Sequence, residues 1–147
     1  MEKAGHLIFG SILGVLLIAL THYFLKWFTF TPTTMGVMIG IIYVYSLLPD
    51  IDIKSGTIVW TFFGVGLLAI IIGYATKNNP YMLIGIILLV VTFLSVTFFK
   101  HRGYTHSIMF ALVVSLPLIF FHWNYSILAL VCYYSHLIAD GEAFKLL

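Results

Sequence analysis

The sequence predicts an all-α membrane protein, a polytopic bundle of about six transmembrane helices. Of its 147 residues, 62% are hydrophobic and only 8% are charged, and the mean hydropathy is +1.11. Soluble globular domains are about 45–50% apolar and about 25% charged, and disordered chains have the opposite balance. The composition therefore excludes both classes. The length predicts a single domain over residues 1–147, because one domain takes about 150 residues.

Clusters of polar residues, proline and glycine divide the chain into six apolar runs. These runs cover residues 7–28, 34–48, 57–75, 81–99, 107–121 and 125–139. A helix needs about 20 residues to cross a hydrocarbon core of about 30 Å. The second, fifth and sixth runs have only about 15 residues, so either their helices extend through the neighbouring polar residues or those residues lie below the membrane surface. A β-barrel is disfavoured because its strands alternate apolar and polar residues, whereas these runs are apolar all round.

The first run is predicted to be a retained span. It is longer than the apolar region of a signal peptide and has no small-residue cleavage box where one belongs. Two pairs of small residues, Gly10/Gly14 and Gly36/Gly40, have the spacing that lets helix backbones approach closely in lipid.

The basic residues predict the orientation. With six spans, both termini and the loops at 49–56 and 100–106 share one side. That side holds Lys3, Lys54, Lys100, Arg102 and Lys145, and the other side holds Lys26 and Lys77. The positive-inside rule then places the N-terminus in the cytoplasm of a multi-pass inner or plasma membrane protein. The net charge of +2 gives no indication of a nucleic-acid partner, and the bilayer is the predicted partner.

The ionisable residues of this topology gather on the predicted cytoplasmic side: His6, Asp50, Asp52, His101, Arg102, His106, His136 and Asp140. His136 and Asp140 have i, i+4 spacing, so they share one helix face and can bind a single ion. Asp50 and Asp52 follow Pro49, which disfavours helix at the preceding residue and predicts an extended or turn segment with both carboxylates facing the same way. Gly103 predicts a turn before the fifth run, with Thr105 as a candidate helix cap.

Carboxylates together with imidazoles suit zinc, manganese or iron better than calcium, and they can hold one or two ions. Each residue alone is equally well a solvated group at a loop end. The coincidence of three Asp and four His at one end favours a divalent metal site, with zinc the first choice. His22 and His122 fall at the opposite end, beside Trp27 and Trp123, and are interpreted as interfacial anchors.

Four segments resemble, in order, the motifs of the YdjM-like family, which are LexA-regulated, membrane-bound proteins described as metal-dependent hydrolases. The segments are Gly5-His6-Leu7-Ile8-Phe9, Leu48-Pro49-Asp50-Ile51-Asp52, His101-Arg102-Gly103-Tyr104-Thr105-His106-Ser107 and Ser135-His136-Leu137-Ile138-Ala139-Asp140. The resemblance implies an inner-membrane hydrolase whose metal ligands are His6, Asp50, Asp52, His101, His106, His136 and Asp140, with Arg102 alongside. Family members often continue after the last Asp with a Thr- and Gly-containing stretch and a Pro-bearing segment. This sequence instead continues with Gly141-Glu142-Ala143-Phe144 and stops at Leu147, which leaves the substrate class open.

The resulting hypothesis is a membrane-embedded metal-dependent hydrolase that acts at the cytoplasmic membrane face. Arg102 would stabilise negative charge on a phosphoryl oxygen, which favours a phosphoester substrate, and a site beside the headgroups favours a lipid-linked one. Asp52 is the candidate general base. The alternatives are a non-catalytic metal-binding protein, in which the metal joins helix ends, and an ion transporter. The transporter is disfavoured because the middles of the runs hold no ionisable residue.

Overall fold

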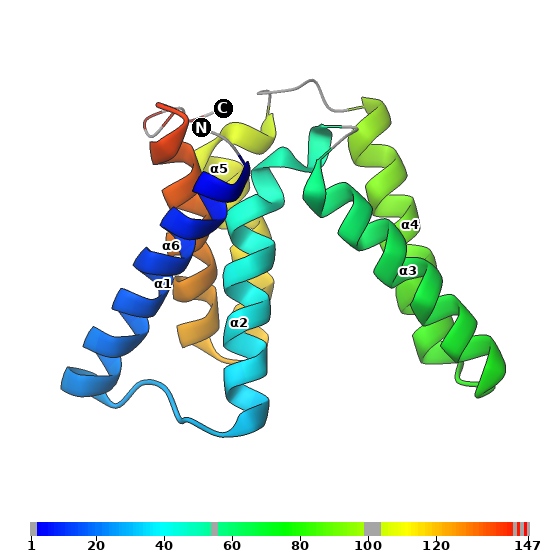
Figure 1. Cartoon of the computed structure of the whole chain (residues 1–147), viewed down its shortest axis with the longest axis horizontal. Coiled ribbons are helices and arrows are strands. Elements are labelled where there is room, and N and C mark those ends of the chain that lie inside the picture. The colour runs from blue at the N-terminus through cyan, green and yellow to red at the C-terminus, as the bar shows by residue number, and fades with distance from the viewer. Residues whose placement is uncertain (1–2, 54–55, 99–103, 143, 145, 147) are drawn as a thin grey trace. The chain divides into compact units, whose positions relative to one another are not determined.

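The computed structural model describes residues 3–53, 56–98, 104–142, 144 and 146, and this part of the chain forms six α-helices and three short 3-10 helices without a strand. The predicted all-α fold is confirmed (Figure 1). The chain divides into two compact units, residues 1–49 with 103–147 and residues 50–102. Each unit is described by itself, and the single domain predicted over 1–147 stays a prediction.

The first unit is built around α6 (Trp123–Ala139). This helix contacts α1 (Lys3–Leu25), α2 (Pro32–Leu47), α5 (Ile108–Ser115) and the 3-10 helix η3 (Leu116–Phe120). Its inner side chains have no solvent exposure: Leu128, Ala129, Cys132, Tyr133 and Leu137. α6 has only 17 residues. Its central position lets both α1 and α2 pack against it.

Helix α2 begins at a capping box, and after it the chain stays helical past the predicted end of the second run. Thr31 and Thr34 exchange hydrogen bonds between side chain and backbone, at 3.2 and 2.9 Å, with Pro32 in the first turn. At the other end the chain continues as the 3-10 helix η1 (Leu48–Asp52). Of the two predicted alternatives at Asp50 and Asp52, the extended segment is therefore wrong, and the chain turns as a 3-10 helix. The φ of proline, near −65°, is that of a 3-10 helix. Residues two apart in a 3-10 helix point about 120° apart, so the two carboxylates do not share one face.

The fifth run is interrupted rather than continuous. α5 ends at Ser115 and the chain changes to η3, which contains Pro117 and hence one backbone position without an N–H donor. The helix cap is Ser107, whose hydroxyl accepts a hydrogen bond from the backbone N–H of Phe110 at 3.2 Å. The prediction of Thr105 as the cap is wrong because the segment Tyr104–His106 is itself a turn of 3-10 helix, η2.

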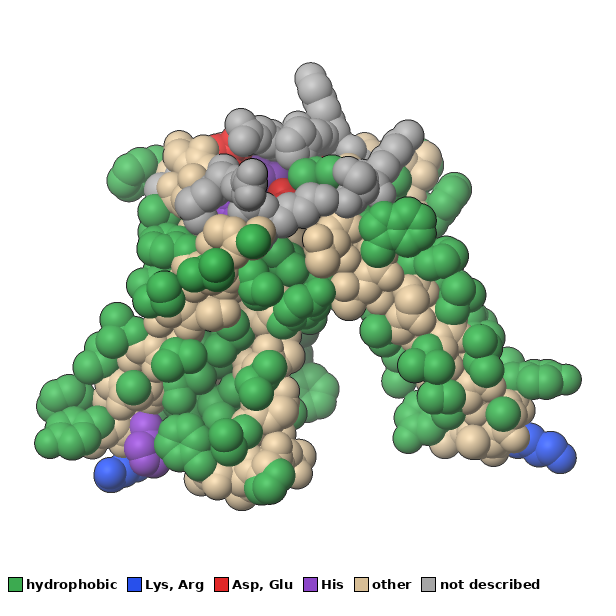
Figure 2. Space-filling view, in the orientation of Figure 1, with side chains coloured by type: hydrophobic (Ala, Val, Ile, Leu, Met, Phe, Trp, Pro, Cys, Tyr) green, Lys and Arg blue, Asp and Glu red, His purple; other side chains and the backbone are tan. Residues whose placement is uncertain are grey.

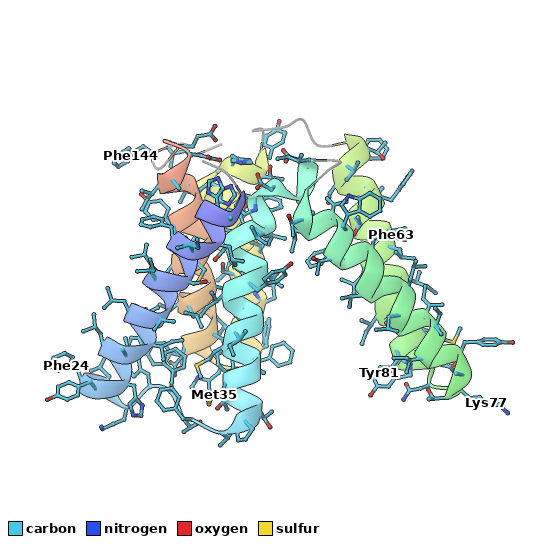
Figure 3. The ribbon with its side chains drawn as sticks, in the orientation of Figure 1. Phe24, Met35, Phe63, Lys77, Tyr81 and Phe144 are labelled. Atoms are coloured by element: carbon cyan, nitrogen blue, oxygen red, sulfur yellow. The ribbon has the colours of Figure 1, made fainter. Side chains whose placement is uncertain are left out.

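The second unit contains an antiparallel hairpin of α3 (Thr57–Ala75) and α4 (Asn79–Phe98). The helices approach most closely at Gly66 and Gly85, where a Cβ added to Gly85 would lie 2.5 Å from the carbonyl oxygen of Gly66. The turn that joins them carries Lys77 in the left-handed region, with φ 53°. Figure 3 shows Lys77 and Tyr81 at this turn.

Among the described residues, four helical segments are long and apolar enough to cross a membrane: Ala4–Leu25, Pro32–Asp52, Thr57–Ala75 and Asn79–Phe98. The second run reaches this length by extending through its polar end, which is one of the two alternatives that the sequence left open. The segment Ile108–Phe120 is apolar but shorter. The helices present hydrophobic side chains on their outer surfaces (Figure 2), such as Phe24, 72% exposed at the end of α1. A helical membrane bundle accounts for this surface.

Candidate metal centre

Three imidazoles and one carboxylate meet at one end of the first unit. Nε2 of His6 lies 3.3 Å from Oδ1 of Asp140, while Nε2 of His136 and Nε2 of His106 lie 3.4 and 3.6 Å from Oδ2. The residues come from the first turns of α1, the end of η2 and the end of α6, which lie at the same end of the unit in Figure 1. We call these four residues the His–Asp cluster.

The His–Asp cluster is buried. His6 is 3% exposed, and His106 and His136 are fully buried. The side chain of Asp140 is only 5% exposed. A carboxylate removed from water in this way is costly unless positive charge or hydrogen bonds compensate it. The cluster is therefore a place where a cation would be stabilised.

The distances in the cluster exceed those of direct hydrogen bonds and are close to those between ligand atoms around a metal ion, with His6 next to Oδ1 of Asp140 and the other two imidazoles next to Oδ2. Hydrogen bonds between nitrogen and oxygen are about 2.7–3.2 Å long. A tetrahedral ion with bonds of about 2.0–2.1 Å holds its ligand atoms about 3.3–3.4 Å apart. The three nitrogen–oxygen distances, 3.3, 3.4 and 3.6 Å, lie near that value. One ligand atom each from His6, His136 and Asp140 lie within 4.8 Å of one another, so this donor set fits zinc, manganese or iron.

A hydrogen bond on the side of the ring away from Asp140 fixes the orientation of His136. Its Nδ1 lies 2.8 Å from the backbone carbonyl oxygen of Ser46 on α2. A carbonyl oxygen only accepts, so Nδ1 carries a proton, and in the neutral ring Nε2 presents its lone pair toward Asp140. The ring of His6 stacks on that of His136, with centroids 3.9 Å apart and planes 11° apart. A hydrogen bond of this kind behind a ligand is typical of metal-binding histidines.

The end of α6 holds Asp140 in place. Asp140 is the C-cap, and its backbone N–H donates to the carbonyl of His136 at 3.0 Å. Gly141 follows with φ 76°, and the N–H groups of Gly141 and Glu142 donate to the carbonyls of Ile138 and Leu137 at 3.0 and 2.8 Å. This is a Schellman motif, whose left-handed position favours glycine. The i, i+4 pair predicted from the sequence is thereby locked at the helix terminus.

His106 is carried by a short segment that α6 also anchors. Its Nδ1 lies 3.3 Å from the hydroxyl oxygen of Thr105. The hydroxyl of the fully buried Tyr133 donates a hydrogen bond to the backbone carbonyl of Thr105. Tyr133 and His136 are three residues apart on α6 and share one helix face. That face therefore presents His136 and also binds the segment that carries His106.

The carboxyl of Asp140 is readily ionised. Burial raises its pKa, but His6 and His136 in their protonated forms attract the carboxylate strongly enough to outweigh that effect, and they place the pKa below its ordinary value of 3.8. Asp140, which follows the last residue of α6, is therefore an anion at neutral pH and available to a cation.

The structure thus brings together four of the residues predicted from the sequence: His6, His106, His136 and Asp140. Asp50 and Asp52 belong to the second unit, are 7% and 5% exposed in the whole chain, and stay predicted ligands. His101 and Arg102 lie outside the described residues.

Two supporting groups were not predicted. The spacing of Tyr133 to His136 was a usable signal, because it places a polar aromatic residue on the ligand face of α6. The carbonyl of Ser46 had no signal in the sequence, because any residue offers a backbone oxygen and only the packing of α2 on α6 selects this one.

Two further histidines of the described residues, His22 and His122, lie at the far ends of α1 and α6. Nδ1 of His22 lies 2.8 Å from the carbonyl oxygen of Phe28. His122 is the N-cap of α6 and packs against Tyr125, with ring centroids 5.9 Å apart. Beside them, Trp27 and Trp123 pack edge to face. These two histidines serve as matched controls for the cluster.

Comparison with known proteins gives one match. The family described as YdjM inner membrane protein matches residues 1–142. No curated protein and no solved structure matches the chain.

Proposed function

The chain belongs to the YdjM inner membrane protein family, and from this premise and the His–Asp cluster we propose that it is a membrane-embedded metal-dependent hydrolase. Its proposed substrate is a phosphoester, lipid-linked by preference, reached from the cytoplasmic membrane face. The observation that carries the proposal is the placement of His6, His106 and His136 around Asp140 at nitrogen–oxygen distances of 3.3–3.6 Å.

The residues proposed to hold a divalent ion, zinc by preference, are the four of the His–Asp cluster. When bound, such an ion supplies a Lewis acid that polarises the scissile group and lowers the pKa of water toward about 7. Asp50, Asp52 and His101 are proposed as further ligands from the sequence pattern, which would allow a second ion.

The chain's own residues have distinct proposed roles. The protonated Nδ1 of His136 and its carbonyl partner at Ser46 hold Nε2 in place. Asp52 is proposed to take the proton of the attacking water as general base. Arg102 is proposed to pair with the phosphoryl oxygens, because its planar guanidinium matches them in shape and charge. Arg102 is the basis for preferring a phosphoester to an amide.

The position of the cluster supports a site with access from one side. His6 lies in the first turn of α1, His106 is the last residue of η2, and Asp140 directly follows α6. A transporter would instead need ionisable groups near the membrane midplane, and the middles of the spans contain none. A headgroup-level site is suited to the polar end of a lipid-linked substrate.

The test is phosphate release by the purified full chain loaded with zinc or manganese. Phospholipids, prenyl phosphates and generic phosphoesters are incubated with the wild type, His106→Ala and His122→Ala. We expect metal-dependent release from at least one class, lost in His106→Ala and retained in His122→Ala. Metal bound without a vacant coordination position, and no product from any class, would favour the non-catalytic alternative. Metal analysis of Asp50→Ala tests whether Asp50 is a ligand.

A further inference from the structure

Helix α1 approaches α2 and α6 most closely at Gly10. A Cβ added to Gly10 would lie 2.7 Å from Cβ of Ser46, would collide with the hydroxyl oxygen of Ser46 and would lie 3.1 Å from that of Ser135. Carbon atoms in proteins do not approach to 2.7 Å without bonding, so the contact at Gly10 exists only because the side chain is absent.

Gly10 lies one helical turn after His6. Residues four apart share one face of a helix, so the face of α1 that rests on Ser46 is the face that presents His6. The carbonyl of the same Ser46 holds Nδ1 of His136 at 2.8 Å, and the ring of His6 stacks on the ring of His136 at 3.9 Å. The distance between α1 and α2 and the distance between the rings of His6 and His136 therefore both depend on Ser46.

We propose that Gly10 is a positioning residue of the metal centre: by allowing α1 to lie directly on Ser46, it brings His6 within reach of His136 and Asp140. This inference rests on the proposed function, because it assumes that the His–Asp cluster binds a divalent ion. Gly10 itself touches no ligand atom and acts through His6.

The other glycines make the inference specific. Gly14, one turn further along α1, faces the side-chain ends of Cys132 and Ile42, whose nearest atoms lie 3.0 Å from an added Cβ. Such side chains can move by rotation. A Cβ added to Gly36 or Gly40 of α2 would have no neighbouring atom within 4 Å. Cβ of Ser46, in contrast, is fixed to the backbone of α2, so an added methyl group at Gly10 must separate the helices.

The experiment measures binding of Co²⁺ to the full chain in detergent, followed by the visible absorption of the bound ion, which reports the number and geometry of its ligands. We expect Gly10→Ala to weaken Co²⁺ binding by at least about tenfold and to change the spectrum in the same way as His6→Ala. Gly36→Ala is the matched control and is expected to bind Co²⁺ as the wild type does. The affinity of Gly14→Ala for Co²⁺ is expected to lie between those of Gly10→Ala and Gly36→Ala.

Rescue at Ser46 separates positioning from general destabilisation. In the Gly10→Ala background, Ser46→Gly removes both close contacts and keeps the carbonyl that holds His136, so wild-type affinity and spectrum should return. Ser46→Ala keeps the Cβ at 2.7 Å and should not rescue. If Gly10→Ala does not fold alone, the Gly10→Ala/Ser46→Gly double variant carries the test, and it is expected to fold and to bind Co²⁺ as the wild type does.

Two results would overturn the inference: wild-type Co²⁺ binding by Gly10→Ala when His6→Ala has lost it, or a folded double variant that binds as weakly as Gly10→Ala. A different result would overturn the proposed function instead. If His6→Ala, His136→Ala and the wild type all bind Co²⁺ alike, the His–Asp cluster is not the metal site.

Discussion

Asp140 is the residue at which the three imidazoles converge. Neutral imidazoles offer lone pairs but no charge, so the carboxylate supplies the negative charge that a divalent ion needs in a buried site. The carboxyl terminus of α6 adds the negative end of its helix dipole at the same place. At this scale the cluster is therefore complementary to a cation.

Removing the charge of Asp140 tests this directly. We expect Asp140→Asn, which keeps the shape of the side chain, to weaken zinc binding by more than about tenfold, because an amide is a poorer ligand and carries no charge. Zinc affinity by competition with a chelator measures the effect. Glu142→Gln removes one negative charge two residues further on and should leave affinity within about twofold. Equal losses in the two variants would mean that only net charge matters.

Tyr133 should affect metal binding indirectly, by its hydrogen bond to Thr105, and not by contact with the metal. Tyr133→Phe leaves a buried carbonyl without its donor, which costs about 1–3 kcal/mol of unfolding free energy. It should also weaken zinc binding, because the segment that carries His106 loses its attachment to α6. Unfolding and zinc titration in detergent measure both. Tyr23→Phe, at a side chain that is 73% exposed, is the control, and identical behaviour of the two variants would exclude this role.

At the scale of single residues, spacing within one helix was predictable and contact between helices was not. The i, i+4 pair of His136 and Asp140 followed from helix geometry, and the structure keeps it. The shared face of Asp50 and Asp52 was mispredicted because Pro49 fits a 3-10 turn as well as an extended segment. The approach of His6 to His136 depends on the packing of α1 on α2 and α6, which residue spacing does not specify.

At the scale of elements, α6 packs against four neighbouring elements, whereas α3 and α4 pack against each other as a hairpin. The hairpin has a seam of close backbone contact at two glycines. Gly66 and Gly85 form that seam, since each faces the backbone carbonyl of the other. Lipid offers no hydrophobic driving force between helices, so close packing at such glycines is what joins them.

A methyl group at this seam should therefore destabilise the hairpin. Gly85→Ala is expected to lower the unfolding free energy by about 1–3 kcal/mol, because the added Cβ meets backbone atoms of α3 that cannot rotate away. At Gly64 an added Cβ would have no neighbouring atom within 4 Å. Gly64→Ala should therefore be neutral or slightly stabilising, because alanine has a higher helix propensity than glycine. Unfolding of the purified chain in a denaturing detergent series measures both. Equal stability of the two variants would contradict the seam.

The boundaries of the elements show what local sequence can specify. The capping box at Thr31 and the stop at Gly141 are local motifs and could be located in advance. The break of the fifth run at α5 and η3 was missed, although Pro117 was its signal, because an apolar run in a membrane protein tolerates proline within a span.

At the scale of the whole molecule, composition determined the class and the basic residues predict the orientation. The apolar outer surface of the helices, seen in Figure 2, is that of a protein solvated by lipid. The predicted topology places the regions before and after α3 on opposite sides of the membrane.

Cysteine labelling tests that topology. In a Cys132→Ala background, which removes the single native cysteine, Lys54→Cys and Lys77→Cys are exposed to a membrane-impermeant maleimide in right-side-out and inverted vesicles. We expect residue 54 to react only from the cytoplasmic face and residue 77 only from the other, because α3, which lies between them, is long and apolar enough to cross the membrane. Labelling of both from the same face would mean that α3 does not cross.

If segments far apart in the sequence build one metal site, the metal content per chain depends on the residues of the His–Asp cluster. After zinc loading and dialysis, elemental analysis of the full chain should find one or two ions in the wild type and in His122→Ala, and a loss of at least one ion in His136→Ala. Equal metal content in all three proteins, or none in the wild type, would contradict the account.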